Sequence, residues 1–582
     1  MEVNWQLRDN NPEISDKLAR ELSISKALSN ILVARGISNV ASAREFLTPR
    51  LDSLHDPFLF EDMEKATRRI LQAVVQREKI LIYGDYDVDG ISSTAVLHSL
   101  LKMVDGDVGY HIPDRLGEGY GMRTERLKMA ADDGVKLIIT VDTGISGIEE
   151  ITLAKEYGID VVVTDHHEPG ETLPPAYAII NPKLSDTKYP FRDLAGVGVA
   201  FKLAWAIAQS FSPTRRVSDE FREFLLDALA LVSLGTVADV VPLLDENRVF
   251  VKFGLKALEN TTRPGLRALL EKTGLAGRKL RSTDIAFRLA PRLNAAGRMG
   301  RSSLGMELFT TDSTREAERI AGELERENRN RQKIEAKIFE NATQCLSEKE
   351  NVCEKIIVLA QEGWHSGVTG IVAAKLADAF NRPVVLIAVN GETGKGSARS
   401  MPDVHIYDLL LKCSEDLIGF GGHAAAAGFE IHTKDIDDFC LQVEENAHKM
   451  IEPESLKKKL KSDMCCSLCS LSIETVRELE QLRPYGEGNP EPIFISDKTA
   501  VAGKPHVIGR DGKHVAMQLR TNNSVFRAVG FGMADVIESL GSFEEISVAY
   551  VPVINSWRGY DTVELELRDI AANGKSLVQK YE

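Results

Sequence analysis

The stretch Lys79-Ile80-Leu81-Ile82-Tyr83-Gly84-Asp85-Tyr86-Asp87-Val88-Asp89-Gly90 decides the fold class. Its first five residues form a short apolar run, which is typical of a buried parallel strand. Acids then stand at every second position. Two later runs have the same form, because residues 136–141 are followed by Asp142 and residues 160–164 by Asp165. Such strands, alternating with amphipathic helices, predict an α/β domain built on a parallel sheet.

The acids after these strands should meet, because the carboxyl ends of parallel strands lie at one edge of the sheet. The converging set is Asp85, Asp87, Asp89, Asp142, Asp165, His166 and His167. Unpaired carboxylates repel one another and cost desolvation energy, so a cation must offset them. Oxygen ligands with one or two imidazoles suit Mn²⁺ or Mg²⁺. The carboxylates suffice for two ions about 3.5–4 Å apart, an arrangement that stabilises phosphoryl transfer.

Each acid taken alone also fits a plain turn or a helix cap. The run from Asp85 matches the start of an EF-hand loop, but its twelfth position is Val96, where a bidentate Glu is required, and this excludes a calcium loop. Asp239 follows an apolar helical stretch and is a plausible further ligand. The convergence of three acidic strand ends beside paired histidines favours a metal site.

Composition bounds the class of protein. The 582 residues are 43% hydrophobic and 27% charged, which predicts a soluble protein of about three or four domains. No stretch approaches the roughly 18 apolar residues of a membrane span, and no signal peptide is apparent, so we expect no membrane association and a cytoplasmic location. The seven cysteines are absent from the first 344 residues, which fits a reducing compartment. The lone CxxC at Cys466 and Cys469 lacks the second ligand pair of a zinc site.

Changes in composition and hydrophobic pattern along the chain predict five segments. Residues 1–56 form a mixed helical segment, and residues 57–311 form the first α/β domain. The highly charged residues 312–350 form a long connecting helix, polar almost all round between Glu323 and Lys333. A second α/β domain covers residues 351–455. Short alternating runs in residues 456–582 predict a small barrel, for which the OB-fold is the leading candidate.

One local charge cluster stands out, although the net charge of -15 argues against wholesale coating of nucleic acid. Between Arg278 and Arg301 seven basic residues accompany one acid, Asp284. Such a run is either a focused anion site or a solvated face, and the sequence leaves both interpretations open.

The ordered set of motifs resembles the DHH phosphoesterase superfamily, named for a triplet that stands here as Asp165-His166-His167. Within it, the chain is most similar to the bacterial single-strand-specific 5′→3′ DNA exonucleases. The other matching motifs are residues 83–90, Val141-Asp142-Thr143-Gly144, Ala238-Asp239, residues 291–298 and residues 363–368. Residues 421–429 resemble the associated DHHA1 domain.

The resemblance implies a DHH core, a DHHA1 domain, an OB-fold module and a cofactor of Mn²⁺ or Mg²⁺, with two ions expected. The implied metal ligands are Asp85, Asp87, Asp89, Asp142, His166 and Asp239, and the catalytic pair is His167 and Asp165. The implied activity is hydrolysis of single-stranded DNA to nucleoside 5′-monophosphates in recombination and repair. A single-strand-binding protein and a helicase are the expected partners, and the expected oligomeric state is a monomer.

Binding of the DNA end and strand is expected from a further set of residues. A terminal phosphate requires Arg forks and small donors. Ser397 and Arg399, with Arg115, fit this role, and the resemblance associates the matching Arg and Ser with the 5′-phosphate. The remaining expected DNA-binding residues are Arg292, Arg298, Gly422 and His423. Four aromatic residues of the barrel, Phe526, Tyr550, Trp557 and Tyr560, are candidate stacking platforms, although each fits a core position better.

Two other functions compete with this hypothesis. One is a small-substrate phosphoesterase of the same superfamily, such as a pyrophosphatase, an oligoribonuclease or a cyclic-dinucleotide phosphodiesterase. The other is a non-enzymatic nucleic-acid-binding scaffold with a decayed site. The barrel and the basic stretch favour a polymeric substrate, and the intact acidic motifs argue against decay.

Overall fold

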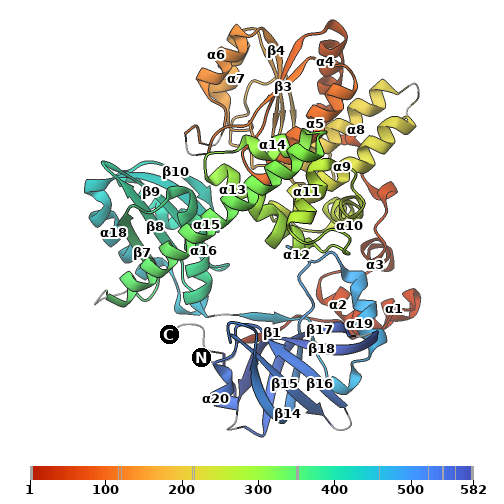
Figure 1. The fold of residues 1–582 in the computed structure, drawn as a ribbon, viewed down its shortest axis with the longest axis vertical. Coiled ribbons are helices and arrows are strands. Elements are labelled where there is room, and N and C mark those ends of the chain that lie inside the picture. The colour runs from red at the N-terminus through yellow and green to blue at the C-terminus, as the bar shows by residue number, and fades with distance from the viewer. Residues whose placement is uncertain are drawn as a thin grey trace. The chain divides into compact units, whose positions relative to one another are not determined.

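The computed structural model describes residues 4–578, except for Leu116, Tyr120, Pro213, Arg215, 349–352, Lys458, 522–523, 541–542 and Arg558. The chain divides into two compact units (Figure 1). The central unit contains Thr48–Gln332 and the separate stretch Leu482–Pro490. The flanking unit contains the residues up to Leu47, then Lys333–Gln481 and the residues from Glu491 onward.

The central unit is built on a parallel sheet of order β3-β2-β4-β5-β6. The strands are β2 (Lys79–Tyr83), β3 (Val108–His111), β4 (Val135–Val141), β5 (Asp160–Thr164) and β6 (Ala178–Ile180). In the register, Tyr83 lies opposite Thr140, and Val141 lies opposite Thr164. The three predicted strands therefore end at the same edge, which is the condition for their acids to meet.

Helices cover both faces of this sheet, which explains why the strands are apolar throughout. One face buries residues such as Ile82 and Ile139 beneath α4 (Met63–Gln76), α5 (Val88–Met103) and α8 (Gly196–Phe211). The other face buries Ile138 and Val163 beneath α6 (Thr124–Asp132) and α7 (Ile148–Glu156) (Figure 1).

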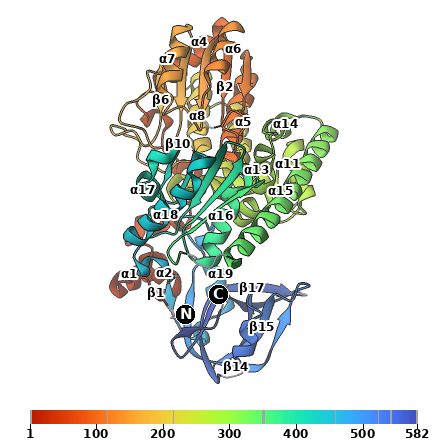
Figure 2. The same ribbon diagram turned by 90° about the vertical axis from the view of Figure 1, so that its left-hand side faces the viewer.

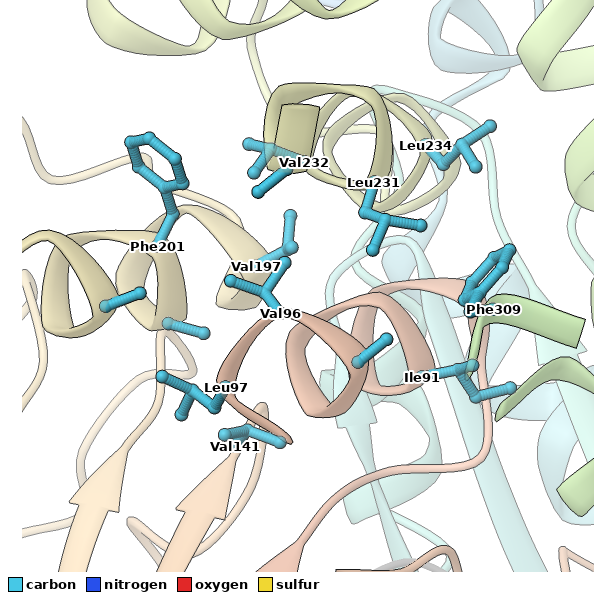
Figure 3. Packing of buried hydrophobic residues seen from close by; sticks show 14 of the residues in the cluster. Ile91, Val96, Leu97, Val141, Val197, Phe201, Leu231, Val232, Leu234 and Phe309 are labelled. Atoms are coloured by element: carbon cyan, nitrogen blue, oxygen red, sulfur yellow. The ribbon is translucent and has the colours of Figure 1, made fainter. Parts of the chain in front are cut away.

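Helix α5 lies at the centre of the core. Leu97 faces the sheet beside Val141, and Val96 lies under Leu231 and Val232 of α9 (Asp219–Ala238) (Figure 3). Most of α5 is buried, so it lacks the polar face of a surface helix. Because α5 begins directly after the acidic loop, its packing fixes where that loop's carboxylates lie.

Further helices complete the central unit beyond α9. They are α10 (Asp245–Glu259), α11 (Pro264–Lys272), α12 (Ser282–Asp284), a π-helix (Ile285–Leu289), α13 (Ala290–Arg298) and α14 (Ser303–Thr310). The basic stretch between Arg278 and Arg301 thus folds largely as the π-helix and α13. Phe309 of α14 packs against Ile91 of α5 (Figure 3).

A second sheet, in the flanking unit, has the order β10-β11-β9-β8-β7. Its strands are β7 (Ile357–Glu362), β8 (Val384–Asn390), β9 (Thr393–Arg399), β10 (Leu417–His423) and β11 (Ala426–His432). Only the pair β7–β8 is parallel among these described strands. One face packs on α16 (Ser366–Phe380), and the other packs on α17 (Ile406–Leu411) and α18 (Ile436–Met450).

The flanking unit also contains a closed barrel, seen in two views in Figures 1 and 2. Its strands are β14 (Phe494–Ile508), β15 (His514–Thr521), β16 (Ser524–Gly530), β17 (Glu545–Trp557) and β18 (Tyr560–Ala572). The order is β14-β15-β16-β18-β17, and the additional pairing of β14 with β17 closes it. The predicted fold class, with a DHH-type parallel sheet, a DHHA1-type α/β domain and an OB-fold barrel, is confirmed.

Smaller elements of the flanking unit precede or accompany the barrel. The first helices are α1 (Pro12–Leu22), α2 (Lys26–Ala34) and α3 (Val40–Leu47), and α19 (Ile473–Leu479) and α20 (Val536–Leu540) belong to the barrel region. Strand β1 (Trp5–Leu7) pairs with β12 (Leu460–Ser462), β13 (Met464–Cys465) pairs in parallel with β14, and β19 (Lys575–Ser576) pairs with β18.

Helix α15 runs without interruption from Thr314 to Glu348. Its middle is polar in sequence, but it is not solvated all round. Leu324, Asn328 and Arg331 recur at helical spacing and are buried, and Arg331 Nη2 donates to Asn328 Oδ1 at 2.7 Å. A buried helix face therefore does not require apolar residues where polar side chains bind one another.

In the part of the chain that the structure describes, no helix combines the length and apolarity of a membrane span.

We predict that Leu97→Ala destabilises the central unit by about 2–5 kcal/mol, because the fully buried side chain leaves a cavity beneath α5. The measurement is thermal or urea unfolding followed by circular dichroism. The control is Leu226→Ala on α9, where the side chain is 39% exposed. Equal effects of the two substitutions would contradict the central place given to α5.

Candidate metal centre

The loop after β2 delivers three carboxylates to one edge of the sheet. Asp87 is the N-cap of α5, and its Oδ1 accepts hydrogen bonds from Asp89 N at 2.9 Å and Gly90 N at 3.1 Å. Asp89 lies in the first turn of α5, and Asp85 precedes the cap. The acids at every second position thus lie where a strand leads directly into a capped helix.

Two further carboxylates come from other elements. Asp142 follows β4 in a left-handed backbone conformation, with φ of 60°, and its N–H donates to Thr164 O at 3.0 Å. Asp239 is the C-cap of α9. Among the described residues, three overlapping groups have ligand atoms within 4.8 Å of one another: Asp142, His166 and His167; Asp89, His166 and Asp239; and Asp85, Asp87 and Asp142.

His166 lies at the heart of this cluster. Its Nε2 is 3.2 Å from Asp142 Oδ1 and 3.6 Å from Asp239 Oδ2. Burial, and then the neighbouring His167, lower the pKa of His166 to about 3. The ring is therefore neutral at physiological pH, which is the form that binds a metal ion through nitrogen.

Asp165 orients its neighbours through hydrogen bonds. Its Oδ1 accepts from His166 N at 2.8 Å and His167 N at 3.1 Å and lies 2.7 Å from His167 Nδ1, while Oδ2 accepts from Ile145 N at 2.9 Å. Burial opposes ionisation of Asp165, but the hydrogen bond and charge of His167 outweigh it, so the pKa of Asp165 is lowered. Burial likewise opposes the charged form of His167, but Asp165 outweighs it and raises the pKa of His167.

Four of the other carboxylates lie where ionisation is unfavourable. Burial, reinforced by neighbouring carboxylates, raises the pKa of Asp85, Asp142 and Asp239 well above the ordinary value. The same causes raise the pKa of Asp89 to about 7. Asp85 Oδ1 and His166 Nε2 are buried with no hydrogen-bond partner among the described residues. This donor set of oxygens and imidazole fits a hard divalent cation.

Glycines provide the space that these carboxylates occupy, which the sequence analysis missed. A Cβ on Gly196 would lie 2.6 Å from Asp142 Oδ1, and one on Gly235 would lie 2.5 Å from Asp89 Oδ1. Gly196 N and Val197 N donate to the two oxygens of Asp89 at 2.7 and 2.9 Å. The sequence Gly196-Val197-Gly198 could have predicted this contact, because small residues at the start of a helix leave its backbone N–H groups open to a carboxylate.

The basic stretch reaches the centre through α13. Asn294 Oδ1 accepts from Val88 N at 3.2 Å, a contact with the acidic loop that the matching motif at residues 291–298 did not predict. Arg298 ends this helix. Arg292 is engaged within the unit, because its Nε lies 2.6 Å from Glu325 Oε2 and its Nη1 donates to Arg288 O at 2.5 Å. A phosphate contact by Arg292 stays a prediction, and it would compete with this ion pair.

Arg115 lies near the acidic loop. Its guanidinium is 4.9 Å from the centre of the Tyr86 ring, and its charge lowers the pKa that burial raises at Asp85. Tyr120, which follows Arg115 in the chain, lies outside the described residues.

The flanking unit contains the other expected DNA-binding residues. Thr369 Oγ1 lies 3.4 Å from Ser397 Oγ, and a Cβ on Gly370 would lie 2.9 Å from Arg399 Nη2. Gly370 at the start of α16 thus makes room for the Arg399 guanidinium. Ser397 and Arg399 therefore both lie beside the first turns of α16.

Gly422 and His423 end strand β10. Gly422 has φ of 150° and lies so close to β11 that a Cβ would meet Ala426 O at 2.4 Å. His423 pairs with Ala426 and is exposed. Of the candidate stacking platforms, Phe526 and Tyr550 are core residues and Tyr560 is 79% exposed. The Trp557 side chain lies outside the described part of the chain.

Comparison with known protein families agrees with this architecture. Residues 79–233 match the model of the DHH family N-terminal domain, residues 353–449 match the DHHA1 domain, and residues 462–569 match the RecJ OB domain. The parallel sheet and its acidic edge thus define a DHH-type phosphoesterase, a class of hydrolase that acts on phosphodiester bonds.

Full-length relatives identify the family more closely. The chain is 37% identical to the single-stranded-DNA-specific exonuclease RecJ of Bacillus subtilis, over 98% of this chain and 71% of that protein. It is 34% identical to RecJ of Haemophilus influenzae, over 94% of this chain and 97% of that protein. The crystal structure of Thermus thermophilus RecJ with Mn²⁺ matches at TM-score 0.84 and 30% identity, over 98% and 80% of the two chains. The chain belongs to the RecJ family of single-stranded-DNA-specific exonucleases.

The predicted cofactor, Mn²⁺ or Mg²⁺, is confirmed at the level of the metal type. Thermus thermophilus RecJ has been solved with each of these ions, the Mg²⁺ complex matching at TM-score 0.77 and 29% identity over 98% of this chain and 79% of that one. The clustered acids and histidines of this chain are positioned to bind them. The number of ions and the ligands of each ion stay predictions.

We predict that Gly235→Ala weakens Mn²⁺ binding by about 10–100-fold, because the new methyl group collides with the Asp89 carboxylate. Alanine favours a helix interior more than glycine does, so helix propensity alone would stabilise the variant. The measurement is titration of free Mn²⁺ by electron paramagnetic resonance. The control is Gly322→Ala in α15, where nothing lies within 4 Å of the added atom. Wild-type affinity in Gly235→Ala would contradict the contact.

We predict that metal-free protein loses stability as pH rises from about 4 to about 7. Asp89 has a pKa near 7 in the folded state and 3.8 as its ordinary value, so the folded state holds its proton more tightly over this window. Stability from this group is complete below the lower value and is lost as pH passes the higher one. The measurement is the melting temperature in EDTA and in Mn²⁺ at pH 5.5 and pH 8. Stabilisation by Mn²⁺ should be larger at pH 8, and a larger effect at pH 5.5 would contradict the burial of these charges.

Proposed function

We propose that this protein is a single-stranded-DNA-specific exonuclease that degrades strands in the 5′→3′ direction and releases nucleoside 5′-monophosphates. The observation that carries the proposal is the convergence of Asp85, Asp87, Asp89, Asp142 and Asp239 with His166 at the carboxyl edge of the sheet. Similarity to RecJ exonucleases over nearly the whole chain supports the polymeric substrate. The proposed biological setting is DNA recombination and repair.

The overlap of the three ligand groups supports a centre with two ions. Asp142 and His166 each belong to two of the groups. The two oxygens of the Asp142 carboxylate could hold two neighbouring ions, whereas the neutral His166 ring, with one free ring nitrogen, would hold one. When bound, such a pair of ions supplies an activated water and neutralises charge on the attacking and leaving oxygens. The chain's own contribution is to hold the carboxylates and the neutral His166 ring in place before substrate arrives.

His167 is proposed to act on the substrate as a hydrogen-bond donor. Asp165 engages its Nδ1 at 2.7 Å and raises its pKa, which favours the imidazolium form. An imidazolium can donate from Nε2 to a non-bridging phosphate oxygen or deliver a proton to the leaving 3′ oxygen. Asp165 serves this step by orienting the ring rather than by touching the substrate.

Recognition of the 5′ end is proposed to use Ser397 and Arg399 of the flanking unit. Arg115 of the central unit is proposed separately as a phosphate ligand. A terminal phosphate carries more negative charge than an internal one, and a guanidinium binds it through paired N–H groups. Gly370 leaves the space in which the Arg399 guanidinium lies. Arg298, Gly422 and His423 are proposed to contact the DNA strand beyond its 5′ end. Arg292 is proposed to do the same when its ion pair with Glu325 breaks.

The barrel is proposed to bind single strands through backbone charge and base stacking. Among its described aromatic side chains Tyr560 is the most exposed candidate. Cytoplasmic location, action as a monomer, and cooperation with a helicase and a single-strand-binding protein are part of the proposal through family membership.

We predict that Asp142→Asn abolishes Mn²⁺-dependent hydrolysis, with a loss of at least about 10³-fold, while melting temperature stays the same or rises because a repulsive charge is removed. The measurement is digestion of one oligonucleotide labelled at the 5′ end and one labelled at the 3′ end. Wild-type protein should release the 5′ label at once as a mononucleotide and shorten the 3′-labelled strand progressively. Release of the 3′ label first would refute the direction, and turnover by Asp142→Asn would refute the site.

We predict that Arg399→Gln removes discrimination between 5′-phosphorylated and 5′-hydroxyl strands. The lost charge-assisted bidentate contact corresponds to about 1.5–3 kcal/mol, or about 10–100-fold in kcat/KM on the phosphorylated strand only. The measurement is the ratio of initial rates on the two substrates. Arg382→Gln on the same unit is the matched control. A uniform loss on both substrates would assign Arg399 to the strand rather than to its end.

A further inference from the structure

A short stretch of the barrel region folds as part of the central unit. Residues Leu482–Pro490 pack with Thr48–Gln332, whereas the chain on either side belongs to the flanking unit. The segment, named here the anchor segment, has no long helix or strand of its own. Its turn is closed by Gly486 N donating to Asn489 O at 3.0 Å and Asn489 N donating to Gly486 O at 3.1 Å.

Two buried polar side chains hold the anchor segment. Arg248 of α10 is 1% exposed, and its guanidinium donates to Leu482 O at 2.9 Å, Arg483 O at 2.9 Å and Pro484 O at 3.4 Å. Asn489 is fully buried, and its Nδ2 donates to Leu482 O at 2.7 Å and Pro484 O at 2.8 Å. Burial of an arginine requires that its donors be satisfied, and here the backbone of the anchor segment satisfies them.

The anchor segment packs on the loop that follows Asp239. Leu243 N donates to Glu487 O at 2.8 Å. A Cβ on Gly486 would lie 2.6 Å from Leu243 Cδ1, and one on Gly488 would lie 3.1 Å from Pro242 Cβ. The loop is also held by Asn247, whose Nδ2 donates to Pro242 O at 3.0 Å.

This loop has a strained backbone at both ends. Val240, directly after Asp239, has φ of 62°, and Asp245 has φ of 43°. A left-handed conformation is unfavourable for a β-branched residue and persists only where the surroundings enforce it. Val240 is itself 64% exposed, so its own side chain provides little of that enforcement. The enforcing contacts are those on Pro242 and Leu243, together with Leu244, whose Cδ1 would lie 3.3 Å from a Cβ on Gly488.

We infer that the anchor segment is a positioning element for the metal centre, holding the strained loop 240–245 so that the Asp239 carboxylate stays aimed at His166. Asp239 Oδ2 lies 3.6 Å from His166 Nε2, so a small relaxation at Val240 moves a proposed ligand away from the ion. The inference rests on the proposed metal-binding role of Asp239. It makes the barrel region contribute to the metal centre through backbone contacts, in addition to its proposed DNA binding.

The test measures Mn²⁺ affinity without DNA, by electron paramagnetic resonance on the full chain. The variants are Gly486→Ala, whose methyl group pushes on Leu243, and Asn489→Ala, which removes two hydrogen bonds within the anchor segment. The matched control is Gly419→Ala, where nothing lies within 4 Å of the added atom. We expect about a tenfold weaker Mn²⁺ affinity in both variants, in the range of outer contacts of metal ligands, and wild-type affinity in the control.

A double-mutant cycle separates positioning from general destabilisation. In an Asp239→Asn background, Gly486→Ala and Asn489→Ala should have no further effect on Mn²⁺ affinity if they act through this carboxylate. Additive losses would overturn the inference, as would wild-type affinity in folded Gly486→Ala and Asn489→Ala. If both variants fail to fold, Ser282→Ala decides the matter, because it removes only the hydrogen bond to Tyr485 O at 2.5 Å and should weaken Mn²⁺ binding by a smaller factor. Wild-type affinity in Ser282→Ala would then overturn the inference.

The outcome is independent of the proposed nuclease activity. Unchanged Mn²⁺ affinity in Asp239→Asn alone would remove the premise and overturn the inference, whereas a wild-type protein that binds Mn²⁺ but does not hydrolyse DNA would refute only the proposed function.

Discussion

Mutual repulsion of buried carboxylates is the constraint on which this structure depends. Asp85, Asp89, Asp142 and Asp239 are gathered where burial and their neighbours oppose ionisation. A chain that folds in this way carries an electrostatic cost that packing elsewhere must offset. The cost is also what creates affinity, because a divalent cation relieves repulsion and desolvation together.

The rest of the central unit holds these carboxylates in place. Helix α5 is buried on nearly every side, so the loop that caps it cannot move away from the sheet edge (Figure 3). Backbone N–H groups at the start of α8 stabilise the charged form of Asp89, and absent side chains at Gly196 and Gly235 leave the carboxylates room. Asp165 accepts hydrogen bonds from the backbone N–H groups of both histidines and lies 2.7 Å from His167 Nδ1, which holds the two histidines in place.

Division of labour among similar residues follows from their surroundings. His166 and His167 are adjacent in sequence, yet burial keeps one neutral while an acidic partner favours the charged form of the other. Arg292 and Arg399 both belong to motifs expected at phosphate, and both are engaged. Arg292 Nε lies 2.6 Å from Glu325 Oε2, whereas Arg399 Nη1 donates to Ala398 O at 2.7 Å. A residue type in a motif thus indicates a kind of chemistry, and the neighbouring groups determine which contacts the side chain makes.

By itself, the sequence determined the strands, the acidic loop and the order of the folds. Apolar runs that end in acid predict both a parallel strand and the edge at which its acids meet, because connectivity and strand direction fix that edge. The tertiary structure alone decided which side chains share one ion-sized space. The role of Asp165, the glycine contacts with Asp89 and Asp142, and the return of Leu482–Pro490 to α10 join segments far apart in the chain. Such contacts depend on how helices and strands pack together. The hydrophobic periodicity of the sequence therefore does not predict them.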